Sequence, residues 1–421
     1  MANAGAKKGA DTGKETKRFG EKRQAVIHAA SRSINEVGLQ ATTLSGVARA
    51  IGLNATSVTY YFPRKDRLAV AVYEETLERL EDMASEALAQ GDPAACLRKY
   101  IALHVALRGR IRRGESGLIT SLSEIRTLDV EARGPLLTRY RQMVDTVRAF
   151  FGEPRSHHER TVFAARTYVL LEAMMWWPVW SLRYSYLDFP RVEERLFDIL
   201  ANGLPSAVGR WQPPGLADTG WRSDTGSLPS QNDEFLRAAT VMINERGYRG
   251  ASVNRIAEVL NVTKGSFYHH HEGKDELVLA CFQRSYDRLS AVQMAGQHSE
   301  GDYWTRLSGT LAELLDLQFF DAMPLLRTTA LQALDSEQKA DVVTRSNRLA
   351  RRFAGFLIDG IADGSVRPID PLVASQVIMS TLNGAYEARN WAARFGDPAG
   401  AIETYATTLT SGLLAPVEER T

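Results

Sequence analysis

The sequence has few cysteines, no long apolar run and almost no net charge, and the first two shortages exclude whole classes of protein. Cys96 and Cys281 cannot form a disulfide framework in 421 residues, and we expect both to be small buried side chains in a reducing cytosol. The longest apolar run, residues 173–180, contains Pro178 and is far shorter than the roughly twenty residues of a bilayer span. The N-terminal stretch lacks the apolar core of a secretory signal. No membrane association is therefore expected.

The motifs of common enzyme classes are also missing. The sequence has no Gly-x-Ser-x-Gly elbow, no P-loop, no Gly-rich dinucleotide fingerprint and no His-Glu-x-x-His motif. We therefore expect no enzymatic activity and no cofactor. The run from His269 to His271 does not indicate a metal site, because successive residues on a helix point about 100° apart.

An internal repeat organises the chain. When the sequence is shifted by 209 residues, its two halves align without gaps over about sixty residues and meet again near their ends. The matched positions include Ile34-Asn35-Glu36 with Ile243-Asn244-Glu245, Gly38 with Gly247, Ala48 with Ala257, Lys65-Asp66 with Lys274-Asp275, and Gly203 with Gly412. A period this long excludes a solenoid and indicates two related halves.

Both halves are predicted to be helical throughout, which makes the fold class all-α. Residues 191–204 and 341–361 carry apolar side chains at i, i+3, i+4 spacing, and no segment alternates strictly between polar and apolar. The expected parts are a disordered basic tail (1–18), a helix-turn-helix domain (19–68), a helical bundle (69–204), a linker (205–231), a second helix-turn-helix domain (232–277) and a second bundle (278–415).

Residues 42–68 have the pattern of a helix-turn-helix. Thr43 is a suitable N-cap for a short amphipathic helix, and Gly52 permits the left-handed turn that follows it. Asn54 then caps a second short helix over residues 55–61, and Lys65 opens a longer one. In such a unit the second helix lies in the major groove of DNA.

The second half has the same plan at the same spacing. Ser252 and Thr263 stand at the cap positions, and Lys274 opens the following helix. Asn261 stands where the first half has Gly52, and asparagine tolerates the left-handed conformation second best.

The segments 38–68 and 247–277 resemble the helix-turn-helix of the TetR family of bacterial transcriptional regulators. The resemblance rests on the spacing from Gly38 through Gly52 to Lys65-Asp66 and Leu68, and on Val262-Thr263-Lys264-Gly265-Ser266-Phe267-Tyr268 in the second half. The first copy departs from the family pattern at Ala55 and Thr56, where the family has Lys and Gly. The second copy has His271 where the family has a Phe that packs under the helix, which weakens that packing.

The resemblance implies two sets of DNA contacts. Phosphate contacts are implied for the helix caps, for a late residue of the recognition helix and for the Lys that opens the next helix. These are Thr43, Tyr61 and Lys65 in the first copy, and Ser252, Lys264, His270 and Lys274 in the second. Base contacts are implied for Ala55, Thr56, Ser57, Thr59 and Tyr60, and for Gly265, Ser266, Tyr268 and His269. Alternatively, Tyr60 and Tyr61 are core aromatics.

The two copies differ in charge. Residues 1–68 contain twelve Lys and Arg against five Asp and Glu, whereas residues 231–277 contain six against seven. Release of counterions from DNA therefore favours the first copy as the stronger anchor. Since the recognition helices differ at nearly every outward position, the chain is expected to read two different half-sites. The alternative is that the second copy is a degenerate scaffold.

After each helix-turn-helix the resemblance implies a bundle that holds a small effector and dimerises through its last two helices. The last helices of the two bundles are therefore expected to pack into a four-helix intramolecular pseudo-dimer interface. Aromatic and sulfur side chains concentrate in two places, which suits a hydrophobic or aromatic ligand. The candidates are Glu172, Trp176, Trp177, Trp180, Arg183 and Tyr184 in the first half, and Phe319, Phe320, Met323, Tyr386 and Trp391 in the second. Packing in a core or an interface is the alternative for each of them.

The sequence thus predicts a cytoplasmic, ligand-responsive transcriptional regulator. We expect it to be a repressor that binds double-stranded operator DNA. One chain would act as a pseudo-dimer, with further dimerisation left open. One alternative is a chain that dimerises on a palindrome through one active head, where a head is one helix-turn-helix domain. The others are a protein-binding adaptor and a non-specific DNA-binding protein. The near-neutral total charge disfavours the last of these.

Overall fold

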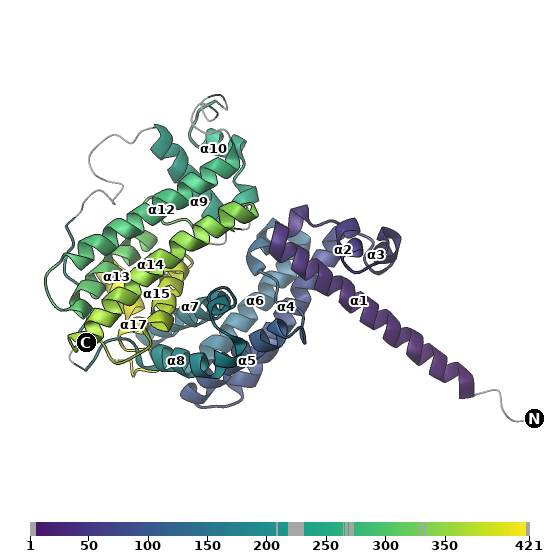
Figure 1. Ribbon diagram of the computed structural model, residues 1–421, viewed down its shortest axis with the longest axis horizontal. Coiled ribbons are helices and arrows are strands. Elements are labelled where there is room, and N and C mark those ends of the chain that lie inside the picture. Colours follow the sequence, from purple (N-terminus) through teal and green to yellow (C-terminus); the bar gives the residue numbers. More distant parts are fainter. Residues whose placement is uncertain are drawn as a thin grey trace, which may run out of the picture. The chain divides into compact units, whose positions relative to one another are not determined.

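A computed structural model describes residues 6–207, 209–217, 231–263, 265, 268, 273–327, 330–331 and 334–417. Every regular element of these residues is helical, apart from one isolated bridge between Pro205 and Val366 (Figure 1). The chain forms two compact units, residues 1–82 with 113–143 and residues 83–112 with 144–421. This division cuts the first bundle, because two of its long helices run from one unit into the other.

The first half contains eight α-helices in the described residues. They are α1 (Ala6–Ala41), α2 (Leu44–Ala50), α3 (Ala55–Tyr61), α4 (Lys65–Leu88), α5 (Pro93–Arg112), α6 (Val130–Arg148), α7 (His157–Trp180) and α8 (Phe189–Asn202). Four short 3-10 helices join them: η1 (Leu122–Thr127), η2 (Ala149–Phe151), η3 (Ser181–Arg183) and η4 (Tyr186–Asp188). The predicted second helix of the motif, residues 55–61, is confirmed.

The second half repeats this order. Its described helices are α9 (Gln231–Gly250), α10 (Val253–Val259), α12 (Lys274–Gln297), α13 (Tyr303–Phe319), α14 (Ser336–Ala362), α15 (Pro371–Ala385), α16 (Arg389–Ala392) and α17 (Pro398–Thr410). None of the described helices is long and apolar enough to cross a bilayer.

Helix α1 begins at Ala6, inside the stretch that the sequence assigns to a disordered tail. The physical reason is that extending an existing helix is far easier than nucleating one, and residues 6–18 contain four Lys and no Pro. Gly38 has a φ of 82° and interrupts α1 near its end, and Gly247 has a φ of 73° at the matching place in α9. A side chain at either position would be strained.

The core of the first unit joins the head to residues farther along the chain. Val47, Val58 and Phe62 of the motif are buried with Tyr73 of α4 and Leu136 of α6. The Asn35 side chain ties α1 to the loop before η1, since its amide donates to the Ile119 carbonyl and its oxygen accepts from the Ser121 N–H.

The matching asparagine of the second half does the same. The Asn244 amide donates to the Leu325 carbonyl, and its oxygen accepts from the Arg327 N–H. The repeated Ile-Asn-Glu sequence therefore marks a repeated clamp between the first helix of each half and the loop before the third bundle helix.

Within the second unit, α7 and α8 of the first half pack against α15 and α17 of the second, as the sequence predicts (Figure 1). We call this contact the seam. At its end the Leu204 N–H donates to the Leu409 carbonyl, and the Leu413 N–H donates to the Leu200 carbonyl. A shift of 209 residues converts each bond into the other. Each half thus uses the same surface, as the subunits of a two-fold symmetric dimer do.

The first part of the expected linker is packed against the second half. The Ser206 N–H donates to the Ser365 carbonyl, and the Trp304 indole N–H donates to the Arg210 carbonyl over 2.9 Å. Pro214 lies against Gly309 of α13. Residues 205–207 and 209–217 are therefore an ordered extension of the seam, whereas residues 208 and 218–230 lie outside the described residues.

Candidate DNA-binding site

Side-chain caps set the ends of α2 and α3 in the first head. Thr43 Oγ1 accepts from the Gly46 N–H over 3.0 Å, and Asn54 Oδ1 accepts from the Ser57 N–H over 2.7 Å. Between the helices Gly52 has a φ of 67°, and the Leu53 N–H donates to the Ala48 carbonyl. These caps and this turn hold α3 against α2 at the angle of a helix-turn-helix.

The recognition helix α3 has one inward face and one outward face. Val58 is fully buried, and the Phe62 that follows the helix is nearly so. Ala55, Thr56, Thr59 and Tyr60 are exposed, and Ser57 is half-buried. The side chains proposed to read bases therefore lie on the surface, and Tyr60 is 73% exposed, which excludes a core role for it.

Aromatic rings link the end of α3 to α1. Phe19 lies 5.9 Å from the Tyr60 ring and 4.8 Å from the Tyr61 ring, measured between ring centroids. The Tyr61 ring is half-buried against the core of the head. Tyr61 thus packs partly into the core, and only its edge is available for the proposed phosphate contact.

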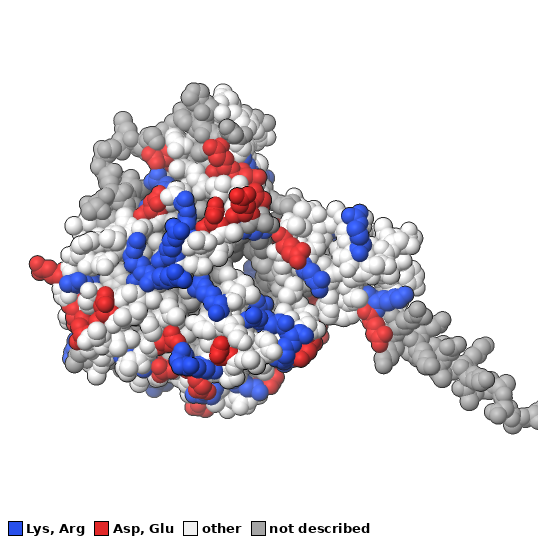
Figure 2. Space-filling view, in the orientation of Figure 1, with Lys and Arg blue, Asp and Glu red and all other residues white. Residues whose placement is uncertain are grey.

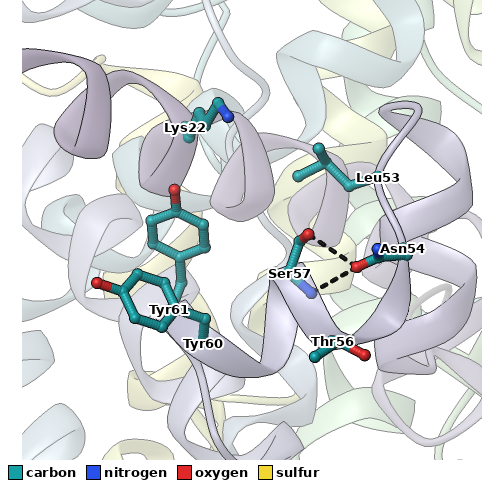
Figure 3. A pocket seen from close by; sticks show the side chains of 7 residues that line it. All are labelled: Lys22, Leu53, Asn54, Thr56, Ser57, Tyr60 and Tyr61. Atoms are coloured by element: carbon teal, nitrogen blue, oxygen red, sulfur yellow. Dashed lines mark hydrogen bonds between the residues drawn. The ribbon is translucent and has the colours of Figure 1, made fainter. Parts of the chain in front are cut away.

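A hollow of about 310 Å³ lies beside this aromatic group (Figure 3). Lys22 borders it from α1, and Leu53, Asn54, Thr56, Ser57, Tyr60 and Tyr61 line it from the turn and α3. Figure 3 shows the Ser57 backbone and hydroxyl both held by the Asn54 side chain. An exposed cation next to exposed hydroxyl groups suits a phosphate or a base edge.

Sequence reasoning missed Phe19 and Lys22. Both lie on α1, about forty residues before α3, and only folding brings them beside the recognition helix. The general excess of Lys and Arg before residue 24 was the only signal for Lys22. Lys65, in contrast, lies where expected, and its ammonium donates to the Gln40 carbonyl over 2.6 Å.

The turn of the second head repeats that of the first. Ser252 Oγ accepts from the Arg255 N–H, and the Val262 N–H donates to the Ala257 carbonyl. Asn261 has a φ of 53°, so the predicted left-handed asparagine is confirmed. Among the residues that the structure describes, it is the one non-glycine with a positive φ.

The outward residues of the second head are only partly described. Gly265 and Tyr268 are exposed, with 56% of Tyr268 accessible. Lys264, Ser266, His269, His270 and the packing residue His271 lie outside the described residues. In the remaining described part, no group of three His, Cys, Asp or Glu could hold a metal.

Lys274 differs from its counterpart Lys65. Its ammonium lies 3.8 Å from the centroid of the Tyr248 ring, and the Tyr248 hydroxyl bonds to Asp275. A cation held over an aromatic ring beside a carboxylate is less available to a phosphate. The lysines at matching positions are therefore placed differently in the two heads.

The proposed effector residues fall into two groups. Phe319, Trp391 and Tyr405 form an aromatic cluster with ring centroids 5.3–6.1 Å apart, and Trp177 packs on Trp180 and Phe189. Met323 is buried, Tyr184 and Tyr386 are half-buried, and Phe320 is partly exposed. Of the candidates, the structure places Trp176, Trp180 and Arg183 together on one small cavity.

Comparisons with known proteins agree with the two heads. The family model described as bacterial regulatory proteins, tetR family, matches residues 26–72 and 235–281. A tetracyclin repressor-like C-terminal domain matches residues 321–391. The chain therefore belongs to the TetR family and contains its DNA-binding segment twice. It is a DNA-binding transcriptional regulator of a non-enzymatic family.

Two sequence relatives each align with less than half of this chain. The HTH-type transcriptional repressor KstR2 of Mycolicibacterium smegmatis is 28% identical over 148 residues, 34% of this chain and 72% of the relative. The HTH-type transcriptional regulator RutR of Escherichia coli is 24% identical over 183 residues, which are 43% of this chain and 82% of the relative. The solved structure of ketosteroid transcriptional regulator KstR2 of Mycobacterium tuberculosis covers 44% of this chain and 93% of its own, at 26% identity and a TM-score of 0.37.

Proposed function

We propose that this chain is a repressor that reads an asymmetric operator with two non-identical heads and is released by a small effector. The observation that carries the proposal is the reciprocal pair of backbone bonds at the seam, Leu204 to Leu409 and Leu413 to Leu200. In a symmetric dimer such a contact pairs identical heads, which read a palindrome. Here the paired halves differ in sequence, so the two half-sites differ as well.

The outward residues of the heads support different readouts. The first head exposes Thr56, Thr59 and Tyr60, whereas the second exposes Gly265 and Tyr268. Small hydroxyl and methyl groups favour contact with a thymine methyl, and tyrosines favour phosphates or base edges. Lys22 adds positive charge next to α3, and Lys65 opens the helix that follows it.

The effector acts by population shift in this proposal. A ligand that binds better to a form unfit for DNA lowers operator affinity, and a 100-fold loss requires about 2.7 kcal/mol of coupling. One relative, KstR2, is a transcriptional repressor, which favours repression over activation for this chain.

Footprinting on a selected operator tests the two-head proposal. Thr56→Ala is expected to relax sequence preference in one half-site only, and Tyr268→Ala is expected to act on the other. Tyr61→Phe is expected to weaken all operators alike, by about 1 kcal/mol for a single lost hydrogen bond. Tyr186→Ala, an exposed tyrosine of η4, is the matched control.

If Thr56→Ala and Tyr268→Ala both alter the same half-site, the two heads do not read separate half-sites. If Tyr268→Ala and Tyr186→Ala are equally without effect, the second head is a scaffold and the alternative of a chain that dimerises on a palindrome is favoured.

A further inference from the structure

A small cavity of about 50 Å³ lies at the seam, between the two halves of the chain. The first half lines it with Trp176, Val179 and Trp180 from the end of α7 and with Arg183 from η3. Asn347 of α14 and Asn383 of α15 are among the residues that line it from the second half. Val179 is 44% exposed, so the cavity is accessible from solvent.

One wall of the cavity is aromatic and held in place. The Trp176 indole N–H donates to Glu172 Oε2 over 3.0 Å. Glu172 is buried against Gly384 of α15, and this burial raises the pKa of its carboxyl to about 7. The Trp180 ring packs on Trp177 and lies 6.1 Å from Tyr184. Two fixed indoles form a surface for a flat apolar group.

Positive charge lies next to this aromatic wall, whereas the residues that line the cavity from α14 and α15 are uncharged. Arg183 forms no ion pair or hydrogen bond with any residue that the structure describes, and Arg351 of α14 adds a second positive charge near it. Partial burial and this neighbour lower the pKa of the Arg183 guanidinium. Figure 2 shows basic side chains gathered along α14, which carries Arg345, Arg348, Arg351 and Arg352. Arginines that form no ion pair with a carboxylate among the described residues favour an anion.

The cavity has no duplicate at the matching place in the other half. The 209-residue shift places Ala385, Arg389 and Ala392 where α7 and η3 have Trp176, Trp180 and Arg183. The paired indoles and the arginine are therefore absent from the symmetry-related position. A ligand site built from these residues occurs once in each chain.

We propose that this seam cavity binds one small aromatic carboxylate, with its ring on Trp176 and Trp180 and its carboxylate on Arg183. The proposal rests on the proposed function, for which this ligand is the effector. Ligand sites usually enclose about 300–1,000 Å³, so binding must widen the cavity by moving α7 away from α14 and α15. Binding therefore acts on the contact between the two halves, and with it on the pairing of their heads.

Calorimetry on the full chain tests the site, with 1-naphthaleneacetate, phenylacetate and benzoate as probes and 1-naphthaleneacetamide as the neutral control. At least one acid is expected to bind with one ligand per chain, and naphthaleneacetate at least tenfold more tightly than its amide. Arg183→Gln is expected to weaken binding of the acid at least tenfold and of the amide less than twofold. Arg191→Gln, an exposed arginine of α8, is the matched control.

A second variant tests whether the site spans the two halves. Asn347→Phe fills the cavity from α14 and is expected to abolish binding of the acid, with an unchanged circular dichroism spectrum as the check on folding. The proposal is overturned if none of the acids binds at 10 mM, if acid and amide bind equally, or if neither variant alters binding.

The parallel measurement of operator affinity separates this proposal from the proposed function. If the free chain binds operator and naphthaleneacetate weakens that binding tenfold or more, both are supported. If the free chain binds no DNA, the proposed function fails, and calorimetry alone decides on the site. If the acid binds as expected but leaves operator affinity unchanged, its role as effector is overturned.

Discussion

The two helix-turn-helix units have the same backbone turn and different surfaces. Gly52 and Asn261 both adopt the left-handed conformation, and the backbone bond after each joins matching residues. Yet Lys65 donates to a backbone carbonyl at the surface, whereas Lys274 lies over the Tyr248 ring. The comparison teaches that a duplicated turn can retain its geometry while the chemistry presented to DNA diverges.

The two bundles likewise share a backbone arrangement at the seam and differ in their side chains there. Its two backbone hydrogen bonds are related by the 209-residue shift, and so are its two glycines. The backbone of Thr410 leaves no room for a side chain at Gly203, and the backbone of Ala201 leaves none at Gly412. Its side chains are not reciprocal, because Thr381 stands at the position that matches Glu172. The backbone of the seam is therefore symmetric, whereas the cavity beside Glu172 occurs on one side of it.

The largest expected effect comes from breaking the backbone symmetry. A Cβ at Gly412 would lie 2.2 Å from the Ala201 carbonyl oxygen, and its φ is 79°. Gly412→Ala is expected to destabilise the chain by about 3 kcal/mol or more, through overlap together with backbone strain. Urea unfolding measures it, with Gly396→Ala as the control, since a Cβ at Gly396 meets nothing within 4 Å. Equal stability of the two variants would contradict close packing at the seam.

The next effect concerns the buried carboxyl of Glu172, which has no counterpart in the second half. Burial raises the pKa of Glu172 to about 7 from its ordinary value of 4.5, so the folded chain retains a proton that the unfolded chain loses between those pH values. Stability therefore falls as pH rises from about 4.5 to 7, by roughly 3 kcal/mol at most. Glu172→Gln is expected to remove this fall and to raise the unfolding midpoint at pH 8 relative to the native chain. A native-like fall in the variant would show that another group is responsible.

A smaller effect on stability is expected at the left-handed residues of the two turns, Gly52 and Asn261. Gly52→Ala places a Cβ in the left-handed region and is expected to cost about 1–2 kcal/mol. Asn261→Gly relieves the mild strain of Asn261 and is expected to leave the second head equally or more stable. Hydrogen exchange of the amides in α2 and α10 measures both changes locally. If Asn261→Gly lowers protection of α10, the asparagine side chain stabilises the turn by a contact of its own.

The smallest effect concerns the matching lysines. Each phosphate contact contributes about −0.9 to the slope of log affinity against log salt. Lys65→Gln is expected to reduce the magnitude of that slope by about this amount, whereas Lys274→Gln is expected to change it much less. Titration of operator binding at several salt concentrations measures both. Equal changes would indicate that Lys274 leaves the Tyr248 ring to contact DNA.

Much of the heads could be predicted from the sequence because their signals are local. The caps Thr43, Asn54 and Ser252 and the left-handed Gly52 and Asn261 each depend on neighbours within four residues. Periodicity was also enough to predict the all-α fold, whereas the pairing of the last helices followed from the family resemblance together with the repeat.

The rest depends on contacts between distant residues. Nothing near Phe19 indicates that it meets Tyr61, and nothing near Pro214 indicates that it packs on Gly309. The aromatic pattern likewise did not distinguish Trp391, which belongs to a packed cluster, from Trp176, which borders a cavity. Such distinctions arise from tertiary packing, which composition and periodicity do not encode.

Selection of bound sequences from random duplex DNA, combined with the mass of the complex, tests the central claim most directly. The account predicts an asymmetric site bound by one chain, with two unlike half-sites about one helical turn, roughly 34–36 Å, apart. A palindrome bound by two chains would contradict it, and would mean that one head alone reads DNA while the second half serves as scaffold.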